Sequence, residues 1–165
     1  MSATWGDGAS DEASARETFE RGRALFEGGD PEGALPVLEI AYAAEGNDSR
    51  VRSYYGLCLG LVDRRFEEAV ELCQSAVKQE FFNPDLYFNL ARLHFGFGFK
   101  LEGVRFLRRG LMIDPSHEGI LRSLREVGDR ATPVLGFLPR RHPVNRWLGA
   151  VRHSVVTFRP LRWVS

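Results

Sequence analysis

The sequence predicts an all-α protein in which three helix-turn-helix repeats stack into a solenoid. Between Pro84 and Pro115, residues suited to helix packing lie at relative positions 0, 3, 4 and 7, which places them on one face of a helix. Those residues are Tyr87, Leu90, Ala91 and His94. A break at Gly96–Gly98 separates this run from a second run with the same helical period.

Small residues fix the period of the repeats, because two sets of them recur at intervals of 35 and then 34 residues. The sets are Ala34, Ala69 and Gly103, and Ala41, Ala76 and Gly110. Small residues at helix crossings let the two axes approach closely, so we expect these positions at the contacts between paired helices. The extra residue of the first interval is assigned to the turn at Val62–Arg65.

The chain is long enough for one packed domain, which we expect at residues 14–128. Residues 1–13 are predicted to be a disordered acidic lead. The repeats are expected at about 15–48, 49–83 and 84–115. Asp30 and Pro31 suit the N-cap and first position of a helix. Pro36 lies further into that helix, where a proline costs about 3 kcal/mol and bends the helix.

A capping helix is predicted at residues 116–127, with Ser116 as its N-cap and one apolar face. A solenoid needs such a cap because its last repeat has no neighbour to cover it. Residues 129–165 are predicted to be a connector followed by a basic amphipathic helix that begins near Pro143.

The order of large, small and terminating residues resembles the tetratricopeptide (TPR) repeat, W-x2-L-G-x2-Y…A-x3-F…P. The third repeat carries the pattern in Leu90, Ala91, Gly103, Leu107 and Pro115. This resemblance implies a right-handed solenoid of three TPR units, a capping helix and a C-terminal amphipathic helix. The run LPRRHPVNRWLGAVRH is also similar to the tail of some small bacterial TPR proteins.

In TPR proteins the first helix of each repeat lines a concave groove that binds a peptide or helix. Carried onto this sequence, the groove positions are Phe19, Arg23 and Phe26, then Ser53 and Leu57, then Phe88, Arg92 and Phe95. Arginine can fork onto a carboxylate while the aromatic rings hold apolar side chains. An alternative is that the N-terminal lead or the C-terminal tail covers this stripe.

The co-chaperones of this family that bind heat-shock proteins hold a C-terminal carboxylate with a lysine/asparagine/arginine clamp. This sequence departs from that clamp, since Phe19 stands where the first lysine would be and Tyr54 where an asparagine would be. We therefore do not expect that specific partner, although an acidic or C-terminal group remains the expected ligand of Arg23 and Arg92.

Charge is distributed unevenly along a chain whose formal net charge is zero. Residues 1–50 carry a net −7 and residues 121–165 a net +7. The basic tail and its two tryptophans comprise Arg140, Arg141, Arg146, Trp147, Arg152, Arg159, Arg162 and Trp163. Three alternatives stay open for this tail: packing on the last helices, docking onto an acidic membrane surface, or binding nucleic acid. No nucleic-acid motif supports the third alternative.

The sequence contains no convincing catalytic, metal or cofactor site. The four histidines are scattered, and Cys58 and Cys73 lack the paired spacing of a zinc site. We expect both cysteines to be small core residues. Because Met1–Ser10 shows no secretory signal and no run is apolar enough to span a membrane, a cytoplasmic location is expected, with the inner face of the membrane as an alternative site within it.

Three functions remain as hypotheses. The first is a non-enzymatic adaptor that binds a peptide or helix of another protein in the groove. The second is a small secretion-type chaperone that holds a client segment. The third is a peripheral membrane scaffold anchored by the basic tail. An enzyme is disfavoured because no paired catalytic groups appear, and a homodimer formed through the oppositely charged ends is an open alternative.

Overall fold

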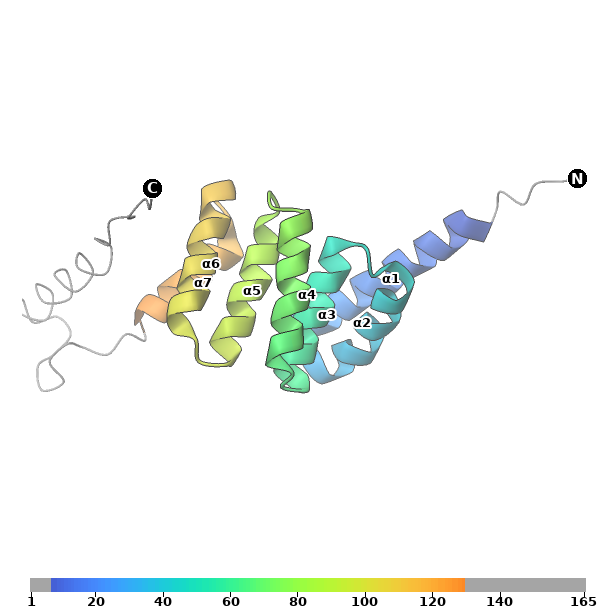
Figure 1. Cartoon of the computed structure of the whole chain (residues 1–165), viewed down its shortest axis with the longest axis horizontal. Helices are drawn as coiled ribbons and strands as arrows, with labels where there is room; N and C mark the ends of the chain where they lie inside the picture. Colours follow the sequence, from blue (N-terminus) through green and yellow to red (C-terminus); the bar gives the residue numbers. More distant parts are fainter. Residues whose placement is uncertain (1–6, 130–165) are drawn as a thin grey trace, which may run out of the picture. The chain divides into compact units, whose positions relative to one another are not determined.

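The computed structural model describes residues 7–129, and every element in that range is an α-helix (Figure 1). The helices are α1 Asp7–Glu27, α2 Pro31–Glu45, α3 Ser49–Val62, α4 Phe66–Gln79, α5 Pro84–Gly96, α6 Lys100–Ile113 and α7 Glu118–Asp129. The all-α solenoid predicted from the repeat period is therefore confirmed. None of these helices is long and apolar enough to cross a bilayer.

The helices form three pairs, α1 with α2, α3 with α4, and α5 with α6. Each pair packs against the next, because α3 contacts α2 and α5, and α4 contacts α5. The successive first helices α1, α3 and α5 therefore share one face of the stack, which we call the α1–α3–α5 face. Residues 1–124 form one compact unit, and of the second unit, residues 125–165, the structure describes only the end of α7.

Small residues lie at the helix crossings, as the repeat period predicted. A Cβ atom on Gly60 of α3 would stand 2.8 Å from the Cβ of Ala69 on α4, and it would also clash with Leu93 of α5. Ala34, Ala69 and Ala76 have no exposed surface. The close approach of the helices thus depends on the absence of larger side chains at these positions.

The turns within the three pairs share a left-handed residue at equivalent positions, Gly29 (φ 91°), Arg64 (φ 60°) and Gly98 (φ 82°). The second repeat alone places a side chain in this conformation, which favours glycine. Each of these turns has three residues between its helices, so the assignment of the extra residue to the turn at Val62–Arg65 is wrong. The extra residue belongs to α3, which has 14 residues where α5 has 13.

Two predicted boundaries differ from the structure. Helix α1 begins at Asp7, so residues 7–13 are helical where the sequence predicted a disordered lead. The capping helix begins at Glu118, and Ser116 is not its N-cap, because the backbone N–H and hydroxyl of Ser116 both donate to Asp114 Oδ1. Instead His117 Nδ1 accepts from the backbone N–H of Ile120 at 3.2 Å. Pro36 is accommodated inside an unbroken α2.

The core is a continuous set of apolar side chains from the paired helices. It includes both cysteines, which are free and buried, as the sequence predicted. The Cys73 thiol donates to the carbonyl of Ser53 at 3.4 Å. Burial raises the pKa of both thiols to about 12, so neither is a reactive thiolate near neutral pH.

Candidate partner-binding site

The structure brings the predicted groove residues onto the α1–α3–α5 face but buries half of them. Phe19 and Phe26 retain 3% and 5% of their surface, and Ser53 and Leu57 retain none. The expectation that these four side chains line an open groove is therefore wrong.

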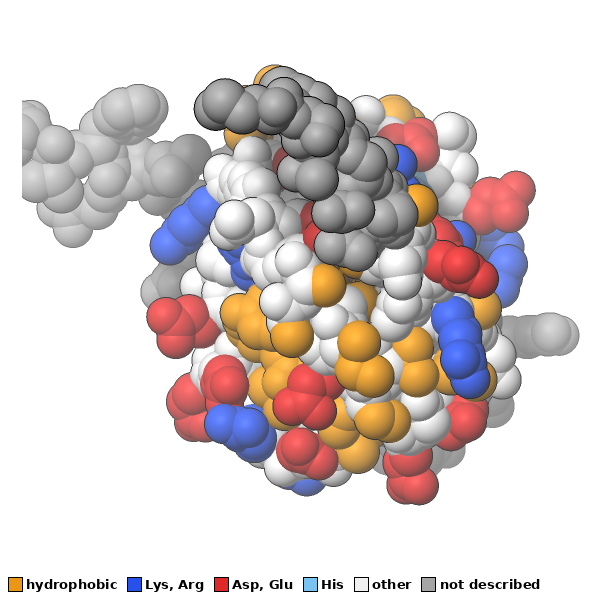
Figure 2. All heavy atoms as spheres, turned by 90° about the vertical axis from the view of Figure 1, so that its right-hand side faces the viewer, with side chains coloured by type: hydrophobic (Ala, Val, Ile, Leu, Met, Phe, Trp, Pro, Cys, Tyr) orange, Lys and Arg blue, Asp and Glu red, His pale blue; other side chains and the backbone are white. Residues whose placement is uncertain are grey.

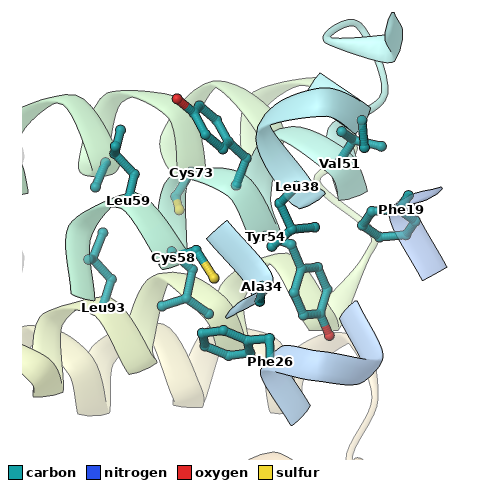
Figure 3. Close-up of a cluster of buried hydrophobic side chains, with 14 of the residues drawn as sticks. Phe19, Phe26, Ala34, Leu38, Val51, Tyr54, Cys58, Leu59, Cys73 and Leu93 are labelled. Carbon is teal, nitrogen blue, oxygen red and sulfur yellow. The ribbon is translucent and has the colours of Figure 1, made fainter. Parts of the chain in front are cut away.

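Tyr54 packs against both buried phenylalanines. Its ring lies between Phe19 and Phe26 in Figure 3, with centroid distances of 5.8 Å and 6.1 Å and edge-on geometry in both contacts. Aromatic pairs in this arrangement attract one another beyond the area that they bury. Tyr54 occupies the position at which the family's clamp has an asparagine, and the larger side chain fills the space between α1 and α3.

On α5, the two predicted phenylalanines are half-buried and pack mainly on other helices. Phe88 contacts the start of α7, because its ring centroid lies 5.6 Å from that of His117 and a Cβ on Gly119 would lie 2.9 Å from its Cε1. Phe95 covers Gly103 of α6, where a Cβ would lie 2.7 Å from its Cδ1. Both rings therefore stabilise the third repeat as well as bordering the α1–α3–α5 face.

Arg92 remains partly accessible on this face. Its guanidinium carbon is 4.5 Å from the centroid of Phe26 and 5.3 Å from that of Phe88. Its Nη1 donates to Glu27 Oε1 at 2.7 Å, and the same oxygen accepts from the hydroxyl of Tyr54 at 3.2 Å. The Arg92 side chain keeps 25% of its surface and that of Glu27 keeps 44%. We call Glu27, Tyr54 and Arg92, with Phe26 and Phe88, the Arg92 cluster.

The pKa of the Tyr54 hydroxyl reflects the burial and the charges of the Arg92 cluster. Burial and then the negative charge of Glu27 raise the pKa of the Tyr54 hydroxyl to about 12, so the hydroxyl remains a hydrogen-bond donor at all physiological pH values. The Glu27 carboxylate consequently has two donors on one oxygen. The arrangement can hold one carboxylate in front of one guanidinium.

Arg23 belongs to a second ion-pair group on this face. It contacts Glu20 at 2.6 Å, and Glu20 also contacts Arg50 at 3.0 Å. Burial opposes ionisation of Glu20, but hydrogen bonds and charge from both arginines lower its pKa overall. Glu20 and, more weakly, the Tyr54 hydroxyl raise the pKa of Arg23, so this ion-pair group adjoins the Arg92 cluster at Tyr54.

Sequence reasoning missed Glu27 and Asn89. Glu27 is the last residue of α1 and lies 65 positions before Arg92, so no local pattern connects the two residues. Asn89 is fully buried on α5, where its Nδ2 donates to Ser53 Oγ at 3.2 Å and its Oδ1 has no hydrogen-bond partner among the described residues. For Asn89, the available signal in the sequence was a polar residue among the apolar positions of its helix.

Apolar surface is also exposed at the end of the solenoid formed by α1 and α2 (Figure 2). A shallow hollow there is lined by Ser14, Ala15, Thr18, Ile40, Ala41 and Ala44. Ile40 is 63% exposed because no helix of the described chain packs outside it.

Residues 7–129 contain no group of three side chains that could hold a metal ion. The predicted roles of the basic tail fall on Arg140, Arg141, Arg146, Trp147, Arg152, Arg159, Arg162 and Trp163. All eight lie outside the described residues, so these roles stay predictions.

Comparison with known proteins places the fold. No protein-family model and no curated protein sequence matches the chain. Among solved structures, the chain is similar to YrrB, "a TPR protein with an unusual peptide-binding site", with 22% identity and a TM-score of 0.54 over 67% of this chain. The match spans 57% of that protein, a little over half of its length.

Two further structures match this chain over nearly their whole length. The TPR domain of Arabidopsis OM64 is 15% identical, with a TM-score of 0.56 over 73% of this chain and 99% of its own. The second TPR domain of human RPAP3, solved in complex with the HSP70 peptide SGPTIEEVD, is 18% identical, with a TM-score of 0.54 over 72% of this chain and 98% of its own. At these identities the similarity is one of fold.

Proposed function

Because the chain has the tetratricopeptide fold, we propose that it is a non-enzymatic scaffold that binds a segment of another protein on the α1–α3–α5 face. Several neighbours of this fold were solved with peptides bound, which supports a protein-interaction role. The described residues also contain no metal cluster, and their two cysteines are buried thiols.

One observation carries the proposal, namely the placement of Arg92 beside two aromatic rings. The contacts with Phe26 and Phe88 restrict the guanidinium and remove part of its hydration. An arginine that is already ordered loses less entropy on binding than a free surface arginine. Arg92 is thus prepared to contact an acidic group, with the half-buried Phe88 beside it for an apolar side chain.

The experiment is to select peptides against the full chain from a display library and to measure their affinity calorimetrically. We expect Arg92→Met to weaken binding by about tenfold or more, since arginines that become buried beneath a partner are often among the residues that dominate the binding energy. Arg105→Met is the matched control because Arg105 is an exposed arginine of α6. Equal affinity of wild type and Arg92→Met would refute the assignment of this face.

A second readout locates the binding surface independently of the substitution. Chemical-shift changes in the full chain should concentrate on α5 and the end of α1 when a selected peptide is added. Changes confined to the exposed pair Phe81 and Phe82, in the loop before α5, would place the partner elsewhere.

A further inference from the structure

We propose that Glu27 is a built-in competitor at the Arg92 cluster, and that a partner binds by replacing it with a side-chain carboxylate of its own. This inference rests on the proposed function, because it concerns the same face. It assigns Glu27 as the residue that sets the affinity and the charge preference of the site.

The contact itself has the form of a bound ligand. Glu27 Oε1 receives one hydrogen bond from Arg92 and one from Tyr54, which come from different repeats. Glu27 contributes the only carboxylate found within ion-pair distance of Arg92 among the described residues. A carboxylate is therefore already accommodated at this guanidinium, which shows the chemistry that the cluster accepts.

Glu27 is also placed where it can leave. It is the last residue of α1, followed directly by the Gly28–Gly29 turn, and its side chain is 44% exposed. An ion pair with this much solvent is easily exchanged, because water and salt screen its attraction. Arg92, with 25% exposure and two rings in contact with it, is the more restricted member of the pair.

The rings determine which carboxylate can enter. Phe26 and Phe88 both lie within 5.3 Å of the guanidinium carbon, and the long, unbranched side chain of Glu27 reaches Nη1 beside them. A partner glutamate can reproduce that approach, whereas a chain-terminal carboxylate arrives with its own backbone and side chain. We therefore assign the ligand as a glutamate side chain within a partner segment, next to an apolar residue that contacts Phe88.

The test compares Glu27→Gln with a control that removes the same charge from the same helix. Glu20→Gln is that control, since Glu20 pairs with Arg23 and Arg50 and has no contact with Arg92. The probe is a fluorescent octapeptide of sequence Leu-Glu-Glu-Leu-Phe-Glu-Glu-Leu with both ends blocked. Two further probes replace every glutamate by glutamine, one with blocked ends and one with a free C-terminal carboxylate.

We expect Glu27→Gln to bind the glutamate peptide about fivefold tighter than wild type, as loss of a partly exposed competing ion pair allows. Glu20→Gln should bind like wild type, and neither glutamine peptide should gain. A Glu27→Gln affinity equal to or below that of wild type overturns the proposal, including the case in which neither binds. A gain for the peptide with the free C-terminus alone overturns the assignment to a side chain.

The outcomes separate this inference from the proposed function. If Glu27→Gln gains no affinity for the glutamate peptide while a display-selected peptide still requires Arg92, the face binds partners and Glu27 serves only to link the first and third repeats. If Arg92→Met also retains the selected peptide, the proposed function itself fails. Circular dichroism of each variant confirms that the helices are intact before binding is measured.

Discussion

Replacing Tyr54 by alanine should both destabilise the solenoid and open the α1–α3–α5 face. The ring is 9% exposed and lies between Phe19 and Phe26. Removing a buried aromatic ring costs about 3–5 kcal/mol, because apolar contacts are lost and a cavity remains. Tyr54→Phe removes only the hydrogen bond to the partly exposed Glu27, which contributes about 0.5–1.5 kcal/mol.

Urea denaturation followed by far-ultraviolet circular dichroism measures both free energies of unfolding. Phe82→Ala is the control, because that ring is 73% exposed and its loss should change stability by about 0.5 kcal/mol or less. The alanine variant should also bind a hydrophobic dye more strongly than wild type, since Phe19 and Phe26 become accessible. A loss of less than about 1 kcal/mol in Tyr54→Ala would refute the conclusion that this ring fills the face.

Two further predictions concern packing and pH. Gly60→Ala should cost about 1–3 kcal/mol in the same urea assay, because the added Cβ would meet Leu93 and lie 2.8 Å from Ala69 Cβ; unchanged stability would contradict the close crossing of α3 with its neighbours. The thiols of Cys58 and Cys73 ionise near pH 9 when unfolded and near pH 12 when folded, so the folding free energy that they contribute is complete below pH 9 and is lost as the pH rises towards 12. Ionisation of each thiol in the unfolded chain should therefore lower the free energy of unfolding as the pH rises through that window, and a Cys58→Ala/Cys73→Ala variant should show a flatter profile in alkaline urea titrations.

The fold could be predicted from the sequence because its determinants are local and repeated. Glycine and alanine at intervals of 35 and 34 residues mark the crossings, and Asp30 with Pro31 marks a helix start. Asp30 Oδ1 does accept from the backbone N–H of Gly33 at 2.9 Å. Such signals depend on residues within one turn or one repeat of each other, so the sequence contains them directly.

The candidate site could be predicted only in part, because exposure depends on side chains from other repeats. The helical positions of Phe19 and Phe26 on the shared face were predicted, but their burial requires the direction of the Tyr54 ring. Likewise, the sequence predicted Arg92 as a binding residue without indicating that Glu27 already pairs with it. Position within a repeat determines which face a residue is on, whereas accessibility is decided by contacts between repeats.

Tyr54 contributes both to the burial of Phe19 and Phe26 and to the position of Glu27 beside Arg92. Its ring contacts Phe19 and Phe26 of α1, and its hydroxyl donates to Glu27, which also pairs with Arg92 of α5. In the proposed function, recognition is concentrated on this guanidinium and on the half-buried Phe88 beside it. A site of this kind gains little from total buried area, so its selectivity depends on how much better a partner carboxylate fits Arg92 than Glu27 does. Added salt should weaken both the internal ion pair of Glu27 and the ion pair with a partner carboxylate. The measured affinity for acidic segments reflects the difference between these two contacts, so it should depend on salt much less than either contact alone.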